Sequence, residues 1–140
     1  MHIKTAFIAA VTLLISGCAM MSPAQRDEAQ RQLEANRPVC MGKLQCEAMW
    51  DAARDWVSSN CAMKIQTITD SYIETYNPPP NSPNIACSVT RNPRPDGSYE
   101  MHMRVWCDNL FGCIPKPFDA MAAFERSVNG TTSRFSSQRK

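Results

Sequence analysis

The stretch that decides the fold reads IACSVTRNPRPDGSYEMHMRVWC and runs from Ile85 to Cys107. Its second half alternates apolar with mostly polar side chains, which is typical of a strand covered on one face only. The middle, 92–97, holds two prolines and an Asp-Gly pair and predicts a turn. We therefore expect two strands, Ile85–Arg91 and Ser98–Cys107. On the second strand, Tyr99, Met101, Met103, Val105 and Cys107 share one face, and Glu100, His102, Arg104 and Trp106 share the other.

A further strand is predicted before this pair. The stretch Met63–Tyr76 is rich in Ile, Thr and Tyr, which favour strands. Its alternation is irregular around Thr69–Ser71, where a bulge or break is expected. Residues 77–84 include four prolines and predict a loop.

One helix is predicted before the strands and one after them. Between Leu44 and Ser59 the apolar residues fall within an arc of about 120° at 100° per residue, which indicates an amphipathic helix. Pro117 suits the first position of a closing helix that continues to Val128. The order predicts a small α+β fold: a three-stranded antiparallel sheet with an amino-terminal and a carboxy-terminal helix packed on one face.

The amino terminus has the features of an export signal. Lys4 precedes an apolar run, Ala6–Ile15, of about ten residues, which is half the length of about 20 that spans a bilayer. The run leads directly into Leu14-Ile15-Ser16-Gly17-Cys18. This motif resembles the lipobox of bacterial lipoproteins. Cleavage by ordinary signal peptidase and a buried amino-terminal helix are the alternatives.

The lipobox resemblance implies that Cys18 is acylated, with chains such as palmitate, and becomes the first mature residue. Several acyl chains anchor a protein stably, so the bilayer is a predicted partner. Ala19 follows, where an aspartate would favour the inner membrane, and we expect the periplasmic face of the outer membrane. The inner membrane is the alternative. We expect a signal peptide (1–17), a lipidated cysteine with a flexible tether (18–39), a globular domain (40–129) and a disordered polar tail (130–140).

Six cysteines remain in the exported chain. An even number in an oxidising compartment predicts disulfide bonds, which also suit a domain of only about 90 residues. These cysteines are Cys40, Cys46, Cys61, Cys87, Cys107 and Cys113.

Two cysteine pairs are close in sequence. Cys107 and Cys113 flank a turn-rich loop that can bring them within bonding range, and Cys40 and Cys46 flank five residues at the start of the first helix. No Cys-x-x-Cys spacing occurs, so structural bonds are favoured over redox or metal chemistry.

The remaining cysteines, Cys61 and Cys87, pair only by elimination. In a meander that turns near residue 80, Cys87 lies opposite about Glu74, far from Cys61, although a disulfide needs Cα atoms within about 7 Å. A break near Asp70, unpaired thiols and a non-local connectivity all stay open.

Motifs spread over residues 40–129 resemble a group of small cysteine-containing lipoproteins of Gram-negative bacteria whose function is unassigned. The resemblance implies the same order of elements and supplies no catalytic residues. It is carried by Cys46-Glu47 with Trp50, Ala53, Trp56 and Val57; by Lys64–Thr67 and Ile73–Tyr76; and by Cys107–Asn109 with Phe111, Gly112, Cys113 and Pro115.

Charge and motifs argue against several functions. Without Lys4, fourteen Lys and Arg face thirteen Asp and Glu, so there is no basic footprint for nucleic acid. The sequence has no Gly-x-Ser-x-Gly, no His-Glu-x-x-His and no glycine-rich phosphate loop. Beyond residue 17 the one histidine is His102, between Met101 and Met103. Alternation places it opposite both methionines, which argues against a copper site, and we expect neither metal nor cofactor.

Three further side chains can each be interpreted as structural or as functional. We expect Trp50 and Trp56 to pack in the core, and the lining of a hydrophobic pocket is the alternative. We expect Glu125 to be solvated at the edge of the last helix, and the role of an acid in a pocket is the alternative. We expect a non-enzymatic envelope lipoprotein that binds a protein partner, as an assembly or maintenance accessory. A small-molecule or lipid-binding module with a pocket between the helices and the sheet is the alternative.

Overall fold

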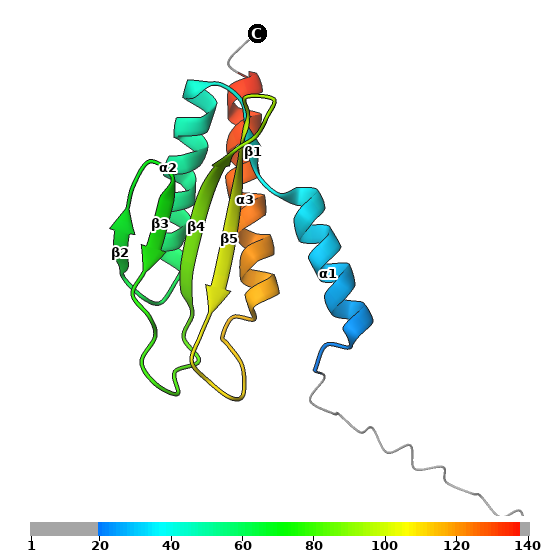
Figure 1. Ribbon diagram of the computed structural model, residues 1–140, viewed down its shortest axis with the longest axis vertical. Helices are drawn as coiled ribbons and strands as arrows, with labels where there is room; N and C mark the ends of the chain where they lie inside the picture. The colour runs from blue at the N-terminus through cyan, green and yellow to red at the C-terminus, as the bar shows by residue number, and fades with distance from the viewer. Residues whose placement is uncertain (1–19, 138–140) are drawn as a thin grey trace, which may run out of the picture.

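The computed structural model describes residues 20–137 as an α+β fold with one five-stranded antiparallel sheet (Figure 1). The strand order is β1-β5-β4-β3-β2. Helices α2 and α3 lie behind the sheet, and α1 lies to one side and leans away from the body. The elements are α1 (Pro23–Asn36), β1 (Val39–Cys40), α2 (Lys43–Asn60), β2 (Ile65–Ile68), β3 (Tyr72–Thr75), β4 (Ala86–Pro93), β5 (Tyr99–Trp106) and α3 (Pro117–Ser137).

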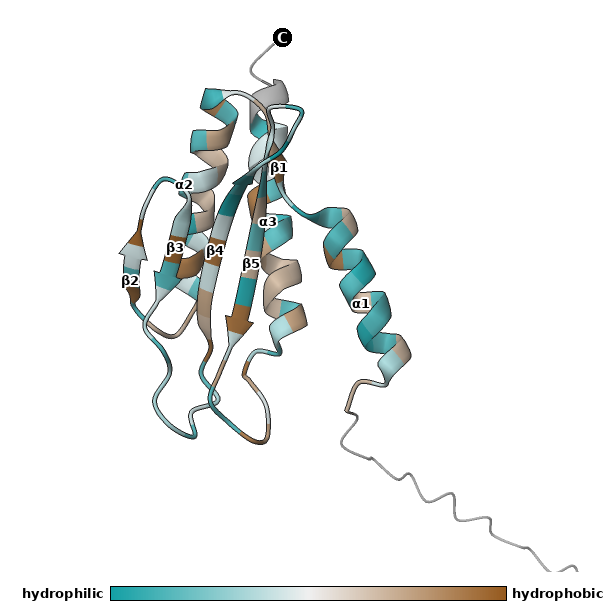
Figure 2. Cartoon of the chain, in the orientation of Figure 1, coloured by the Kyte–Doolittle hydropathy of each residue, from teal (hydrophilic) through white to brown (hydrophobic). Residues whose placement is uncertain are grey.

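The centre of the sheet is the β4–β5 hairpin that the sequence predicted. The two strands pair over eight positions, from Ala86 opposite Trp106 to Pro93 opposite Tyr99. Val89 and Met101 are buried beneath α2 and α3, whereas most of the alternate positions carry polar side chains. Both strands change colour along their length in Figure 2. The hairpin therefore supplies one face of the core.

The predicted three-stranded sheet is wrong, because the sheet has five strands. The stretch 63–76 is not one strand but the hairpin β2–β3. Thr69 makes the turn: its Oγ1 accepts hydrogen bonds from the backbone N–H groups of Ser71 (3.3 Å) and Tyr72 (3.0 Å). A threonine side chain can thus build a turn without glycine or proline. The fifth strand is the two-residue β1, which lies at the other edge beside β5.

The fold also has three helices instead of the expected two. Residues 23–36, expected to be part of a flexible tether, form α1. Ser22 and Gln25 make a capping box, in which each side chain accepts the other residue's backbone N–H, and Pro23 occupies the first turn. Leu33 is the buried residue of this helix. Its burial explains why this polar segment packs against the body.

Helix α3 runs to Ser137, through most of the stretch 130–140 that was predicted to be a disordered tail. Thr132 Oγ1 donates to the Asn129 carbonyl at 2.7 Å and contacts Met49 Sδ of α2 at 4.0 Å. The continued helix therefore extends the packing of α3 against α2. Residues 138–140 lie outside the described part.

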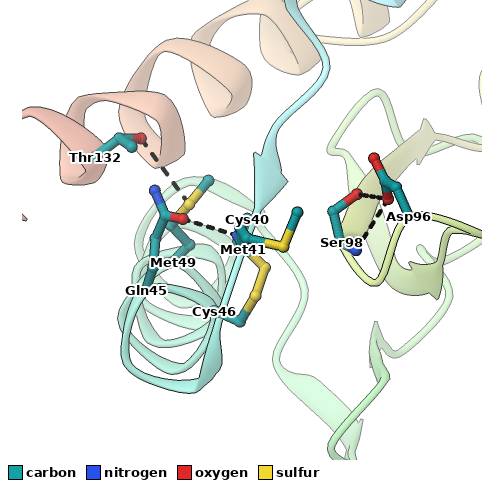
Figure 3. The surroundings of a disulfide bond; sticks show 8 residues. All are labelled: Cys40, Met41, Gln45, Cys46, Met49, Asp96, Ser98 and Thr132. Atoms are coloured by element: carbon teal, nitrogen blue, oxygen red, sulfur yellow. Dashed lines mark hydrogen bonds between the residues drawn. A yellow bond between two sulfur atoms is a disulfide. The ribbon is translucent and has the colours of Figure 1, made fainter.

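The predicted disulfide bonds are confirmed, since three pairs are present. Figure 3 shows the first, which ties Cys40 of β1 to Cys46 of α2. The Cα–Cα distances are 5.0 Å for Cys40–Cys46, 6.1 Å for Cys61–Cys87 and 5.5 Å for Cys107–Cys113.

The break at Thr69 resolves the difficulty over Cys61 and Cys87. Because β2 folds back on β3, the end of α2 returns to the start of β4. There the Ala62 N–H donates to the Ile85 carbonyl at 3.0 Å. Cys61, the residue after α2, thereby lies beside Cys87.

No helix in residues 20–137 has the length and apolarity needed to cross a bilayer.

Candidate functional site

The most distinctive feature of the surface is the way in which α1 is attached. The helix is held at its carboxyl end: the Asn129 side chain donates to the Asn36 carbonyl at 2.7 Å. One residue on, Arg37 Nη1 lies 3.1 Å from Glu100 Oε1, and the Pro38 carbonyl accepts the Met101 N–H at 2.9 Å. The amino-terminal half of α1 is mostly exposed and diverges from the body (Figure 1).

This arrangement leaves a hollow on each side of α1, and we call the two together the α1 groove. The first, of about 450 Å³, lies between α1, α3 and the strands β4 and β5. The second, of about 560 Å³, lies between α1 and α3. Leu33 and Glu125 line both hollows. The first is also lined by Arg37, His102, Met103 and Met121, and the second by Ala29, Phe118, Ala122 and Asn129.

Glu125 is the most unusual group in the groove. The residue is only 8% exposed, and burial raises the pKa of its carboxyl from 4.5 to about 7, although the nearby Arg37 guanidinium opposes the rise. No hydrogen bond to this carboxyl is present in the described part of the chain. The sequence placed Glu125 at a solvated edge, and that interpretation is wrong because α1, expected to be a tether, covers it.

Arg37 is directed to a different carboxylate, Glu100. Burial disfavours the charge on Glu100, but hydrogen bonds from Arg37 and His102 outweigh it and lower the pKa of this carboxyl. His102 Nε2 lies 3.3 Å from Glu100 Oε2. The three side chains form a polar cluster where α1 meets the sheet.

The edge of β5 is open along the groove. Strand β1 pairs with β5 only at Tyr99 and Glu100. The Met101 N–H points away from β4, toward Pro38. Along a strand, successive residues direct their N–H and C=O groups to opposite sides, so every second residue points the same way. The N–H and C=O groups of Met103 and Val105 therefore point the same way, beyond the end of β1.

The side chains that the sequence singled out lie mostly elsewhere. Trp50 donates its Nε1–H to the Thr69 carbonyl at 3.2 Å, and Trp56 packs edge-on against Phe124, with ring centroids 5.6 Å apart. Both hold α2 in the core, as expected. Cys18 lies outside the described residues.

The Met101-His102-Met103 stretch is divided between different surroundings. Met101 is buried in the core, and His102 lies beside Glu100 and lines the groove together with Met103. Across residues 20–137, no three His, Cys, Asp or Glu side chains gather in a way that could hold a metal ion.

Sequence reasoning missed Leu33 and Arg37, because both fall in the expected tether. One signal was available: Ser22-Pro23-Ala24-Gln25 has the spacing of a capping box and marks the start of a helix.

The groove thus combines apolar side chains of α1 and α3, polar side chains of the sheet, a buried carboxyl, the polar cluster around Arg37 and the outward-pointing backbone groups of β5. Such groups can bind a ligand through apolar contacts and hydrogen bonds. Compared with known proteins, the chain matches no protein-family model, no curated protein and no solved structure.

Proposed function

We propose that this protein is a non-enzymatic envelope lipoprotein that binds an extended segment of a protein partner in the α1 groove. The open edge of β5 beside α1 carries this proposal. Acylated Cys18 would hold the protein at the periplasmic face of the outer membrane, or of the inner membrane as the alternative. The lipobox-like Leu14–Cys18 supports the anchor, and three disulfide bonds fit an oxidising compartment.

Strand addition suits this edge. An added strand bonds through its backbone to alternate residues of the edge strand, and here Met103 and Val105 offer both donor and acceptor. Strand β1 already occupies the same line at Tyr99 and Glu100, in antiparallel pairing. The five residues from His102 to Trp106 give about 17 Å of free edge at about 3.3 Å per residue, enough for a strand of four or five residues.

The walls of the groove give such a segment a place for its side chains. Leu33 of α1 and Met121 of α3 provide apolar contacts, and His102 and Arg104 project from β5. Alternate side chains of an extended segment would thus meet different chemistry, which is how strand-addition sites select sequences.

The second candidate is a small-molecule or lipid-binding module. Hollows of about 450 and 560 Å³ fall within the range of about 300–1,000 Å³ typical of ligand pockets. Phe118, Ala122 and Leu33 make the second hollow partly apolar.

The test replaces Gln30, which lines the first hollow, with a photo-crosslinking amino acid in living cells. We expect a discrete protein adduct, and none from the same replacement at the exposed Asp55 of α2. Met103→Pro removes the outward N–H without touching the β4 ladder and should abolish the adduct. Met103→Ala keeps that N–H and should retain it.

Equal adducts from Met103→Pro and Met103→Ala would contradict strand addition, provided that both variants form three disulfide bonds. A small molecule or lipid that copurifies, with no protein adduct, would support the second candidate. Globomycin, which blocks the lipoprotein signal peptidase, should make the precursor accumulate. Unchanged processing would contradict the lipid anchor.

A further inference from the structure

The loop between β5 and α3 presents large apolar side chains to solvent. Leu110 is 94% exposed, Phe111 is 99% exposed and Ile114 is 70% exposed. From Asn109 to Pro115 the loop has no charged residue. Single exposed apolar side chains are ordinary, but a contiguous group of them marks an interaction site.

The exposure of this apolar tip, Leu110–Ile114, does not come from a slack chain. The Cys107–Cys113 disulfide closes the loop, and Asn109 braces it: its Nδ2–H donates to the Asn81 carbonyl at 2.7 Å, and its Oδ1 accepts the Phe111 N–H at 2.9 Å. The loop thus holds the side chains of Leu110 and Phe111 outward in a fixed shape.

The loop also contacts the proline-rich segment that precedes β4. The Ile114 N–H donates to the Pro83 carbonyl at 2.8 Å, which joins the loop to the proline-rich segment 77–84. The segment 77–84 therefore supports the apolar tip through two hydrogen bonds, at Asn81 and at Pro83.

The position of the tip relates it to the amino terminus. In Figure 1 the loop lies at the same end of the molecule as the start of α1, and Figure 2 shows brown residues along it. Four residues lie between Cys18 and Pro23, so the two Cα atoms are at most about 18 Å apart. An acyl chain on Cys18 would therefore hold this end of the molecule close to the bilayer surface.

We infer that the apolar tip, Leu110–Ile114, inserts into the same bilayer leaflet that holds the acyl chains of Cys18. This inference rests on the lipid anchor of the proposed function. Apolar side chains enter the boundary between head groups and acyl chains, and the exposed Lys116 beside the tip suits the anionic head groups there. With the lipid as one contact and the tip as a second, the body takes a defined orientation on the membrane.

The test places p-benzoylphenylalanine at Phe111 in the otherwise natural chain, in living cells, and analyses the irradiated protein by mass spectrometry. Since Phe111 is almost fully exposed, the replacement leaves the packing intact. The matched control is Leu44, 76% exposed at the start of α2, at the opposite end of the molecule (Figure 1). We expect phospholipid adducts at position 111 at least tenfold above those at position 44.

Equal lipid adducts at the two positions, or none, would overturn the inference, and a dominant protein adduct at 111 would assign the tip to a protein partner instead. The mass of the peptide that carries Cys18, measured on the same sample, separates two kinds of failure. If Cys18 is acylated and the adducts are absent, only the insertion of the tip is wrong. If Cys18 is bare, the anchor is wrong and the inference falls with it.

Discussion

Replacing Glu125 with glutamine should stabilise the protein more in alkaline than in acidic solution. Burial raises the pKa of this carboxyl from 4.5 to about 7, so between these values the folded state binds the proton more tightly than the unfolded state. The wild-type protein therefore loses stability as the pH rises through this window. Glutamine does not titrate, and it fills nearly the same volume without a charge to desolvate.

The size of the effect follows from the shift. Only the part of the shift between pH 5.5 and the folded pKa of about 7, about 1.5 units, acts in this pH range. At about 1.4 kcal/mol per unit, it corresponds to about 2 kcal/mol of unfolding free energy between pH 5.5 and 8.5. Solvent in the α1 groove screens the carboxyl and reduces the effect, so about half of this value is the lower bound. The advantage of Glu125→Gln should thus grow by about 1–2 kcal/mol between the two pH values.

Urea unfolding followed by tryptophan fluorescence at pH 5.5 and 8.5 measures this difference. Glu47→Gln on the exposed surface of α2 is the matched control, and its effect is subtracted. Every ionisable group other than the substituted one is the same in each variant, so its contribution to the difference cancels. An advantage that is equal at the two pH values, or larger at pH 5.5, would show that α1 does not bury Glu125 in solution.

Two further changes test the core. Replacing Cys61 and Cys87 with alanines should lower the free energy of unfolding by about 3–4 kcal/mol, measured by denaturation, and replacing Cys107 and Cys113 should lower it by about 2 kcal/mol. The difference arises because the two bonds close loops with sequence separations of 26 and 6 residues. Equal losses would contradict this account. Thr75→Val should cost about 1–3 kcal/mol, since Thr75 Oγ1 accepts the buried Cys87 N–H at 2.9 Å, and Thr75→Ser should restore most of the loss by the same measurement.

The parts of the fold that local sequence determines were predictable. The β4–β5 hairpin combines a Pro-Asp-Gly turn with regular alternation, and α2 has an apolar arc along its whole length. A bulge or break was expected around Thr69–Ser71, but the reversal of direction there was missed. The turn depends on a threonine side chain, and threonine also occurs within ordinary strands. The stretch 63–76 has strand composition throughout, so composition alone did not reveal the reversal of direction.

The candidate site could not be predicted, because it depends on contacts between distant residues. Helix α1 has one buried side chain, Leu33, and the residues at and just after its carboxyl end bind Asn129, Glu100 and Met101, far along the chain. Glu125 was wrongly expected to be solvated, because its burial depends on α1. The expected tether thus concealed the groove. The resemblance to small envelope lipoproteins and the acylation of Cys18 stay predictions.

The way in which α1 joins the body determines how the protein would bear mechanical load. Tension between a membrane-held amino terminus and a ligand in the groove would run through α1 and the end of β5, without crossing α2 or the core. It would be resisted by the contacts of Asn36, Arg37 and Pro38, with the Cys40–Cys46 bond directly behind them. The grip on a ligand under pull would then fail at these few noncovalent contacts before the domain itself unfolded.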